Sequence, residues 1–345
     1  MNIEKAFCHE LGRSIDISQA RNEYFRQDIP RTRFTFSCSS PECQGDLDVK
    51  IVGVNYDKLI TDDENYVQAH FRSKDKDSHS EDCHWVIEEE ARREYIDRGD
   101  SQKEKKTRHR RTTEQNYIEV STFLSRTKPK KSNTEDSSKT VEKGIDTPKL
   151  KASNRSARIK KAISRIERGY TSASFSELVS NYLEISRQKL WDTPLKVEGC
   201  RANTYGQFFK KLEWYDDTKA SEHIYFGSVK VDKVYPKDFD FAQGLPIGIV
   251  LKFYQKATVG DTTSAPTLYI TKKMFDESPA AHVLAESIKA AYLDEDFSNY
   301  LWCHFYGRIE EVERKGRNDE SYTVLSVVPD SIDTLELIPF KKDKS

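Results

Sequence analysis

Two pairs of residues near the N-terminus have the types and the spacing of metal ligands. Cys38 and Cys43 are separated by four residues and His79 and Cys83 by three, with about 35 residues between the pairs. A structural zinc ion takes four such ligands in a tetrahedron, and a short spacing within each pair turns both side chains toward one point. The sequence therefore predicts that Cys38, Cys43, His79 and Cys83 hold a structural Zn²⁺.

The alternative is that these residues are unligated thiols and incidental histidines in polar loops. Cysteine is scarce in the chain, with six in 345 residues, and it prefers burial. The polar surroundings favour a weak core, for which zinc binding of roughly 10 kcal/mol or more would compensate. Both points favour zinc. His84 competes with His79 as a ligand, and Cys8 with His9 is a more distant candidate pair.

The stretches SCSSPEC and AHFRSKDKDSHSEDCHW resemble the N-terminal zinc-finger-like segment of the CoiA family of competence-related proteins. That family pairs two cysteines with a later HF motif, and then with a histidine and a cysteine. The resemblance covers about residues 34–90 and implies that the four residues above are the ligands. It implies a packed or ligand-supporting role for His70. The alternative is that His70 is a histidine in solvent at the end of a strand. The resemblance also implies a nuclease-like region further along the chain.

The C-terminal portion departs from that expectation. A nuclease of the restriction type needs a carboxylate on one strand and a Glu-x-Lys motif on the next, which together hold Mg²⁺ and orient water. Glu336 and Lys341 have the wrong spacing, and Asp232 with Lys233 has no evident partner. The sequence contains no Gly-rich phosphate loop, no HExxH motif and no nucleophile elbow. Nuclease activity is therefore a secondary hypothesis, with Asp232 and Asp330 as the residues to substitute.

Composition indicates folded modules separated by a polar linker. Hydrophobic residues make up 36% of the chain and charged residues 33%, with a mean hydropathy of −0.78, which is too polar for one large globule. The aromatic content of 11% argues against disorder throughout. We predict a multidomain α+β fold with a zinc-ribbon-like β module (1–98), a basic flexible linker (99–155), a helical segment (156–221) and a C-terminal OB-like β-barrel (222–345).

Charge is unevenly distributed along the chain. The net charge is −1, but residues 101–170 hold twenty Lys and Arg against eight Asp and Glu. Such a segment indicates an anionic partner, either nucleic acid or an anionic membrane surface. The alternative is a charged run that only keeps a linker in solution. The linker residues that we predict to neutralise phosphates are Lys105, Lys106, Arg108, Arg110 and Arg111.

The last third of the chain has the element order of an OB-fold, a five-stranded barrel with a helix between its third and fourth strands. Many small α+β domains share this order. A further strand is expected at 334–338. The predicted barrel elements are strands at 223–235, 247–255 and 267–271, a helix at 278–293, and strands at 301–313 and 322–328.

OB-folds bind single strands on the face of strands two and three, where aromatic residues stack on bases and cations neutralise the backbone. Because alternation does not tell which face is wet, the aromatic residues of these strands can equally belong to the core. The predicted contacts are Lys252, Tyr254 and Tyr269 on the strands, with Arg314, Lys315 and Arg317 at the last hairpin tip.

These observations predict a zinc-containing accessory protein that binds nucleic acid in DNA processing, uptake or anti-phage defence. Single-stranded DNA or RNA is a better candidate than duplex. Two other classes stay open: a metal-dependent nuclease, and an adaptor whose zinc module and barrel bind partner proteins. The sequence has no apolar run of membrane-spanning length, no signal-peptide core and no disulfide scaffold, so a cytoplasmic location without membrane attachment is expected.

Overall fold

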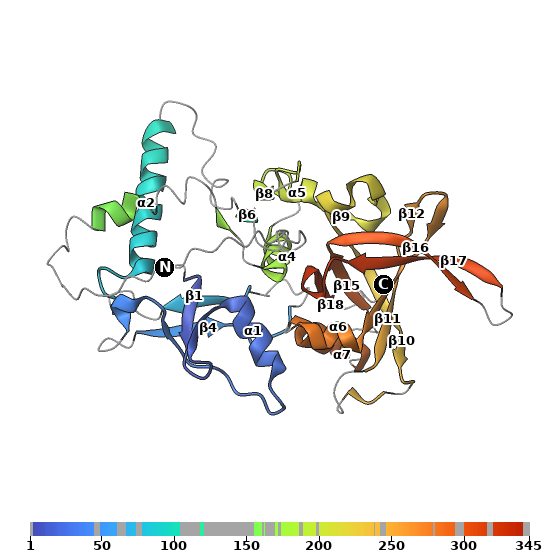
Figure 1. Ribbon diagram of the computed structural model, residues 1–345. Coiled ribbons are helices and arrows are strands. Elements are labelled where there is room, and N and C mark those ends of the chain that lie inside the picture. The colour runs from blue at the N-terminus through green and yellow to red at the C-terminus, as the bar shows by residue number, and fades with distance from the viewer. Residues whose placement is uncertain are drawn as a thin grey trace, which may run out of the picture.

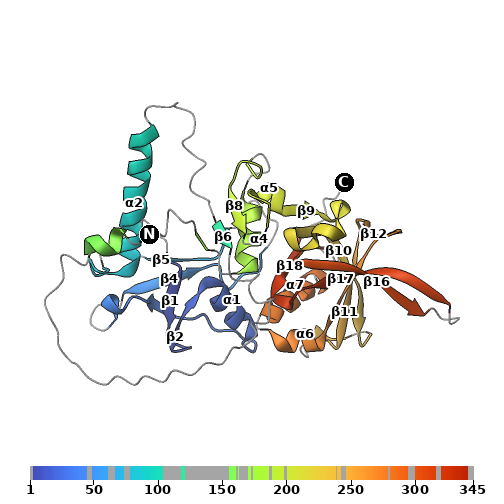
Figure 2. The same ribbon diagram turned by 45° about the horizontal axis from the view of Figure 1, so that its top comes forward.

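The computed structural model is mixed α+β, with several sheets. Figures 1 and 2 show an N-terminal part, which carries the first sheet and the long helix α2, beside a C-terminal part built on a larger sheet. The structure describes residues 3–44, 49–60, 67–73, 78–103, 118–120, 155–160, 162, 170–171, 174–185, 189–197, 200–237, 239–241, 246–278, 280–293, 300–315 and 320–340.

The N-terminal sheet is antiparallel, with the strand order β2-β1-β3-β4-β5. Its strands are β1 (Lys5–Cys8), β2 (Arg13–Asp16), β3 (Phe36–Cys38), β4 (Lys50–Val54) and β5 (His70–Ser73). Helix α1 (Ile17–Arg26) starts directly after β2 because the Asp16 carboxylate accepts a hydrogen bond from the backbone N–H of Gln19 at 2.8 Å.

The core of this part is small and rich in sulfur. Phe36, Ile51 and Phe71 point inward from neighbouring strands and pack around the fully buried Tyr56. Four cysteines lie in the same core: Cys8, Cys38, Cys43 and Cys83.

A short helix at residues 155–160 lies against helix α2 (His84–Lys103), although the two segments are far apart in sequence. Ile159 and Ala162 pack against Ala91 of α2. Arg155 forms an ion pair with Glu90 at 2.9 Å. Part of the basic stretch predicted from the sequence is therefore held against the N-terminal part.

A small parallel sheet gathers three distant segments in the order β7-β6-β8. These strands are β6 (Ile118–Val120), β7 (Tyr170–Thr171) and β8 (Leu195–Val197). Strand β6 comes from the segment that the sequence predicts as a linker. Leu195 and Val197 are buried in a core shared with α4 (Phe175–Glu184), so this sheet belongs structurally with the C-terminal part.

The C-terminal sheet has the order β16-β17-β14-β11-β10-β15-β18, and β9 pairs with β10 beside this path. Neighbours are antiparallel except β14 with β17 and β9 with β10, which are parallel. The strands are β9 (Phe209–Lys211), β10 (Ile224–Tyr235), β11 (Gly248–Phe253), β14 (Thr267–Thr271), β15 (Tyr300–Phe305), β16 (Gly307–Lys315), β17 (Ser321–Pro329) and β18 (Leu335–Pro339).

The predicted closed barrel is wrong, because no sheet in the described residues closes on itself. The segment predicted as one strand bends at Tyr306, so its first half, β15, pairs with β10 and its second half, β16, pairs with β17. Strand β18 occupies the other edge of β15, which leaves β18 and β16 as the two ends of an open sheet.

Gly307 makes this bend possible. Its φ of 155° is a backbone angle that residues other than glycine rarely adopt. A Cβ at this position would also collide with the carbonyl oxygen of Val328. The bend is held by backbone hydrogen bonds of Tyr306, which donates to Thr334 and accepts from Asp330, both at 3.0 Å.

One face of this sheet lines a core to which other strands and two helices contribute, and the other face is covered only in part. Alternate residues of β10 and β15, including Val229, Leu301 and Phe305, face a core closed by α6 (Lys272–Glu277) and α7 (Ala280–Leu293). On the other face, α4, α5 (Tyr205–Phe208) and β9 cover the residues around Ile224 and Ile338. The remainder of that second face is open.

Shorter elements complete the chain. These are η1 (Pro41–Cys43), η3 (Leu212–Trp214), η4 (Asp217–Glu222), η6 (Ile332–Thr334) and the hairpin of β12 (Ala257–Val259) and β13 (Thr262–Ser264).

The two parts of the molecule are in contact. Arg31 of the N-terminal part forms an ion pair with Glu286 of α7 at 2.7 Å, with both side chains largely buried. The Ser18 and Ser174 hydroxyls are hydrogen-bonded at 2.8 Å, and Ile60 is buried in the core around α4. The N-terminal part is therefore packed on the C-terminal part.

Candidate metal centre and nucleic-acid interface

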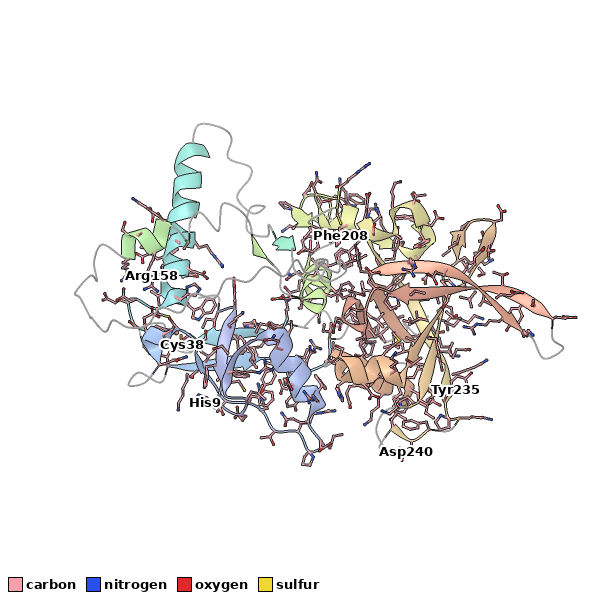
Figure 3. All side chains as sticks on the ribbon, viewed as in Figure 1. His9, Cys38, Arg158, Phe208, Tyr235 and Asp240 are labelled. Carbon is pink, nitrogen blue, oxygen red and sulfur yellow. The ribbon has the colours of Figure 1, made fainter. Side chains whose placement is uncertain are left out.

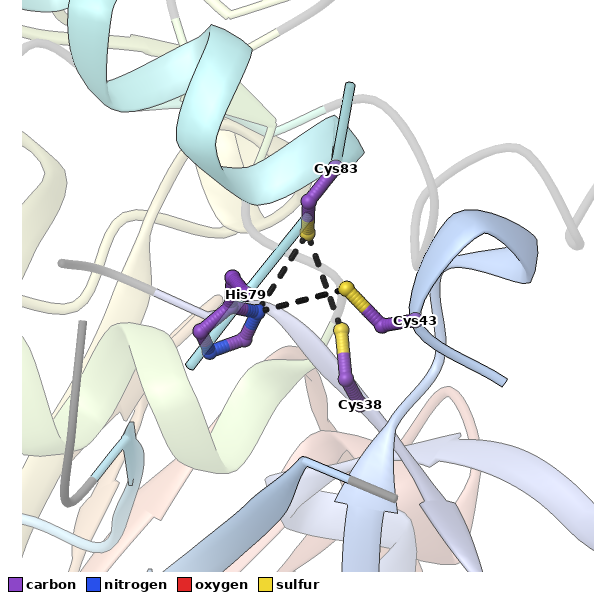
Figure 4. Close-up of side chains that lie close together, drawn as sticks. All are labelled: Cys38, Cys43, His79 and Cys83. Carbon is purple, nitrogen blue, oxygen red and sulfur yellow. Dashed lines mark hydrogen bonds between the residues drawn. The ribbon is translucent and has the colours of Figure 1, made fainter. Parts of the chain in front are cut away.

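The four predicted metal ligands lie together in the structure. Their ligand atoms are all within 4.8 Å of one another, and Figure 4 shows the four side chains pointing toward a common centre. We call this group the metal cluster; it consists of Cys38, Cys43, His79 and Cys83. All four residues are buried.

The distances fit a tetrahedral ion. Zn–S bonds of about 2.3 Å and Zn–N bonds of about 2.0–2.1 Å separate the ligand atoms by roughly 3.5 to 3.8 Å. The Cys38 and Cys83 sulfur atoms are 3.7 Å apart, and the His79 Nδ1 atom lies 3.6 Å from the Cys43 sulfur and 3.4 Å from the Cys83 sulfur. The cluster therefore has the size and the donor set of a metal site.

Two backbone turns bring the pairs together. Cys38 ends strand β3, and η1 then turns the chain so that the Cys43 N–H donates to the Ser40 carbonyl at 2.9 Å. In the second pair, the Cys83 N–H donates to the Ser80 carbonyl at 2.9 Å, directly before α2. The His84 N–H then donates to the Ser40 hydroxyl at 3.0 Å, which joins the two turns.

His79 is oriented by a neighbour outside the cluster. Its Nδ1 atom faces the thiols, and its Nε2 atom lies 3.0 Å from the Ser73 hydroxyl at the end of β5. With a metal bound at Nδ1, Nε2 would carry the ring proton and donate a hydrogen bond to the Ser73 hydroxyl. Such a hydrogen bond fixes the tautomer and the orientation of a ligating ring.

The thiols are arranged to exchange protons for a cation. The hydrogen bond between Cys38 and Cys83 lowers the pKa of Cys83, and the same bond raises the pKa of Cys38. Burial raises the pKa of Cys43. Because the thiolate is the form that binds metal, a divalent cation at this centre would take the place of the protons that Cys38 and Cys43 otherwise keep.

The other candidate ligands lie outside the cluster. His84 Nε2 is 3.1 Å from Glu88, one turn along α2. The Nδ1 atom of His70 is hydrogen-bonded to the Gln68 carbonyl at 2.8 Å. The Cys8 thiol donates to Glu10 at 3.4 Å, and His9 packs edge-on against Phe7. The competing ligands His84, Cys8 and His9 are therefore not members of the cluster, and neither is His70, for which a packed or ligand-supporting role was expected.

The basic helix at 155–160 reaches the surroundings of the metal cluster. Arg158 forms an ion pair at 3.1 Å with Glu42, the residue before Cys43. Figure 3 shows Arg158 and Cys38 in the same region of the molecule, with Tyr235 of β10 in the opposite region. The metal cluster and the far end of the C-terminal sheet are thus well separated.

The predicted nucleic-acid residues fall into three groups. Lys105, Lys106, Arg108, Arg110, Arg111 and Arg317 lie outside the described residues. Arg314 and Lys315 end β16, in the ribbon of β16 and β17 that extends away from the rest of the sheet in Figure 1. Lys252, Tyr254 and Tyr269 lie on or next to the open part of the sheet face.

The open sheet face combines lysines with aromatic rings. The cross-strand register places Lys230 of β10 opposite Lys252 on one side and Tyr300 on the other. The rings of Tyr254 and Tyr300 are stacked, with centroids 5.2 Å apart and an angle of 17°. Tyr254 is 49% exposed, and Tyr269 on the neighbouring strand is 42% exposed. We use the name open sheet face for Lys230, Lys252, Tyr254, Tyr269 and Tyr300.

A second ring pair borders this face. Trp302 follows Tyr300 on the same face of β15, and its ring stacks on Phe340 with centroids 5.0 Å apart. Partial burial and the neighbouring Tyr300 hydroxyl raise the pKa of Tyr254 to about 12, so its phenol stays neutral. Lys230, Tyr300, Trp302 and Phe340 were missed in the sequence, although alternation along β15 already put Tyr300 and Trp302 on one face of that strand.

The carboxylates of the nuclease hypothesis form no comparable group. Asp232 is exposed on β10, whereas Asp330 follows β17, where partial burial raises its pKa. Glu336 is buried in β18, and burial raises its pKa as well. Within the part of the chain that the structure describes, the metal cluster is the one group of three or more His, Cys, Asp or Glu residues that can hold a metal ion.

Among the described residues, no helix has both the length and the apolar character needed to cross a membrane. A search of protein families, of curated proteins and of solved structures finds no match to this chain. The resemblance to the CoiA segment therefore stays a prediction.

Proposed function

We propose that this chain binds single-stranded nucleic acid on the open sheet face and that its N-terminal part is a structural zinc module. The observation that carries the proposal is the arrangement of stacked tyrosines beside lysines on the half of the face that α4 and α5 leave uncovered. An antiparallel sheet can leave one face in water, but a group of exposed aromatic rings rimmed by polar residues is typical of a binding surface.

The chemistry of the face favours single strands. The rings of Tyr254 and Tyr269 are accessible, and every unpaired base has a face that can stack on such a ring. In a duplex the base faces are already stacked on one another. Lys230 and Lys252 are exposed next to the rings and can neutralise the phosphates of a strand that follows the sheet. The basic segment at 101–170 supplies further positive charge for attraction at longer range.

Zinc is the metal that suits the cluster best. Three thiolates and one imidazole are a common ligand set of structural zinc sites, and four protein ligands leave no position for a substrate or water. Soft thiolate ligands exclude Mg²⁺ as the natural occupant. The proposed role of zinc is therefore to hold β3, η1 and the start of α2 together.

The order of strands supports an OB-like architecture for the C-terminal sheet even though no ladder closes it. Strands β10, β11 and β14 are neighbours in order, and β17 lies parallel beside β14. In an OB-fold the face of these strands is the one that binds nucleic acid. The resemblance of the N-terminal segment to CoiA supports an accessory role in DNA processing, uptake or anti-phage defence.

The test is a binding titration of the metal-loaded protein with labelled single-stranded DNA, single-stranded RNA and duplex DNA at several salt concentrations, without Mg²⁺. We expect single strands to bind more tightly than duplex and the affinity to fall as salt rises. Tyr254→Ala should weaken binding by about 1–3 kcal/mol, the range for losing one stacked base.

Tyr322→Ala is the matched control, because Tyr322 is 50% exposed on β17, outside the open sheet face. Equal loss in both variants, or no binding of the unaltered protein at low salt, would reject the proposal. A salt-insensitive complex with a protein partner would instead favour the adaptor hypothesis.

A further inference from the structure

A third feature, distinct from the metal cluster and the open sheet face, is a hollow near the start of β10. It has a volume of about 480 Å³ and is lined by residues from the loop before α5, from β9, and from η3 and η4. That volume lies within the range of about 300–1,000 Å³ that is usual for small-molecule sites. It shares no residue with the other two sites. We call it the cationic hollow.

Three cations from different elements line the hollow. Arg201 comes from the loop before α5, Lys210 from β9 and Lys219 from η4. Lys210 also lies over the ring of Trp191, with its Nζ atom 5.4 Å from the ring centre, which holds its side chain in place. Since these residues are distant in sequence, only the fold gathers their charges.

Two carboxylates line the same hollow. Asp216 is already engaged: it accepts hydrogen bonds from the Thr218 N–H at 3.1 Å and from Lys219 at 2.9 Å. The hydrogen bonds from Thr218 and then Lys219 lower the pKa of Asp216 to about 2, so it stays ionised and paired. Glu222 is the second acid. Its negative charge is outweighed by the two positive charges of Arg201 and Lys210. The hollow therefore carries net positive charge.

An aromatic platform adjoins the cations. Trp214 lines the hollow and is 58% exposed, the most exposed tryptophan among the described residues. The Lys211 Nζ atom lies 5.7 Å from the centre of the Trp214 ring and helps to hold it. An exposed indole beside cations is a suitable surface for stacking a planar base.

A histidine completes the lining. Burial, and after it the charge of Lys210, lowers the pKa of His223, so its ring is neutral near pH 7. A neutral imidazole can donate one hydrogen bond to an anionic oxygen. An arriving phosphate would favour the protonated form of this ring, because it partly cancels the repulsion from Lys210.

We propose that the cationic hollow binds a nucleotide through its phosphate monoester, with Arg201 and Lys210 contacting the phosphate and Trp214 stacking on the base. A phosphate monoester carries up to two negative charges, which matches a cluster of cations better than the single charge of an internal phosphodiester does. This site is independent of the open sheet face and can exist whether or not that face binds nucleic acid.

The first test is calorimetric titration of the metal-loaded full chain with AMP, adenosine and inorganic phosphate, together with the tryptophan fluorescence of the protein, to which Trp214 contributes as one of four tryptophans. AMP should bind at least tenfold more tightly than adenosine or phosphate alone and should quench the fluorescence. Lys210→Gln should weaken AMP binding at least tenfold, and Lys210→Arg should restore most of it. Lys237→Ala, an exposed lysine of the loop after β10, is the matched control and should bind AMP normally.

The Glu222→Gln variant tests the proposal through an increase in AMP affinity. Removing this negative charge should tighten AMP binding several-fold, since the phosphate no longer faces a carboxylate in the hollow. Measurable AMP binding that is no tighter than adenosine binding, or an unchanged affinity in both Lys210→Gln and Glu222→Gln, would overturn the proposal.

Two sources can supply such a phosphate, namely a free mononucleotide and the 5′ end of a strand. Oligonucleotides with a 5′-phosphate or a 5′-hydroxyl separate them, measured in the Tyr254→Ala background so that binding on the open sheet face contributes less. A preference for the 5′-phosphate without AMP binding identifies the strand end. Failure of both AMP and the 5′-phosphorylated oligonucleotide to bind rejects the hollow as a nucleotide site, whatever the sheet face does.

Discussion

The N-terminal part and the C-terminal sheet are stabilised by different means. The N-terminal core is small, and at its edge the four ligand atoms of the metal cluster bring together β3, η1 and the turn before α2. The C-terminal sheet buries residues of β10, β11, β14 and β15 beneath α7, and its other face is partly buried beneath α4. We therefore expect a bound metal to make up for missing apolar burial in the N-terminal part, and the larger core to fold without one.

The largest expected effect is that of removing the metal. Chelation, or Cys83→Ser, removes binding energy of roughly 10 kcal/mol from the N-terminal part, which we expect to lose its fold. Hydrogen exchange measures this directly: amides of β3 and β4 should lose protection while those of β10 and β11 keep it. Cys200→Ser, a half-buried cysteine in the C-terminal part, is the control and should retain both the metal and the protection.

If chelation removed protection from both parts equally, the two parts would not be stabilised separately and the metal would support the whole molecule. The amount of bound metal, measured by atomic emission on the purified protein, should be close to one ion per chain. Absence of metal from protein expressed with zinc would contradict the proposed centre.

The second effect concerns the bend in the C-terminal sheet. Gly307→Ala forces a side chain into a φ of 155° and against the Val328 carbonyl, at a cost of about 2–3 kcal/mol or more in the free energy of unfolding. Urea denaturation followed by tryptophan fluorescence measures this free energy of unfolding. Metal binding should be unchanged.

Gly12 provides the matched comparison in the N-terminal part. Its φ is 63°, but a Cβ there meets no atom within 4 Å, so Gly12→Ala should cost only about 1–2 kcal/mol from backbone strain. A larger cost at Gly12 than at Gly307 would show that the bend is not a critical point of the sheet.

The third effect is a graded one at the metal centre. Ser73→Ala removes the hydroxyl 3.0 Å from His79 Nε2 and should lower metal affinity about tenfold, as is typical of groups that orient a ligand. Competition with a chromogenic chelator measures this loss. Ser73→Thr keeps the hydroxyl and should bind metal almost normally, while equal affinities in all three proteins would mean that the hydroxyl does not orient the ring.

The smallest effect concerns the contact between the two parts. Arg31→Ala breaks the ion pair with Glu286, whose side chains are 16% and 24% exposed, and should destabilise the molecule by about 1 kcal/mol. Arg13→Ala breaks an exposed pair with Glu23 and should have an effect close to zero, since Arg13 is 52% exposed. Thermal unfolding compares the two. A larger loss in Arg13→Ala would mean that the Arg31 contact does not join the parts.

The metal centre was readable from the sequence because its information is local. Two short spacings around Cys38 and Cys83, each within one turn, are enough to predict that each pair converges. The helix ending at Leu293 was readable for a similar reason: Ser278 caps its start, and the Ala280 N–H donates to the Ser278 hydroxyl at 3.1 Å.

The open sheet face was only half readable. Lys252, Tyr254 and Tyr269 were predicted from the second and third strands, but Lys230 and Tyr300 complete the face through cross-strand register, which the sequence does not state. Alternation identifies which residues share a face. It does not tell which face the helices leave uncovered.

The sequence predicts the four residues of the metal cluster, the main strands and the long helix of the C-terminal part, and the position of the basic segment, because each depends on neighbours along the chain. Tertiary structure alone decided three further features. These are the bend at Gly307 that leaves the sheet open, the docking of residues 155–160 on α2, and the gathering of Arg201, Lys210 and Lys219 around one hollow. Each depends on contacts between residues distant in sequence, whose geometry is set only when the chain packs.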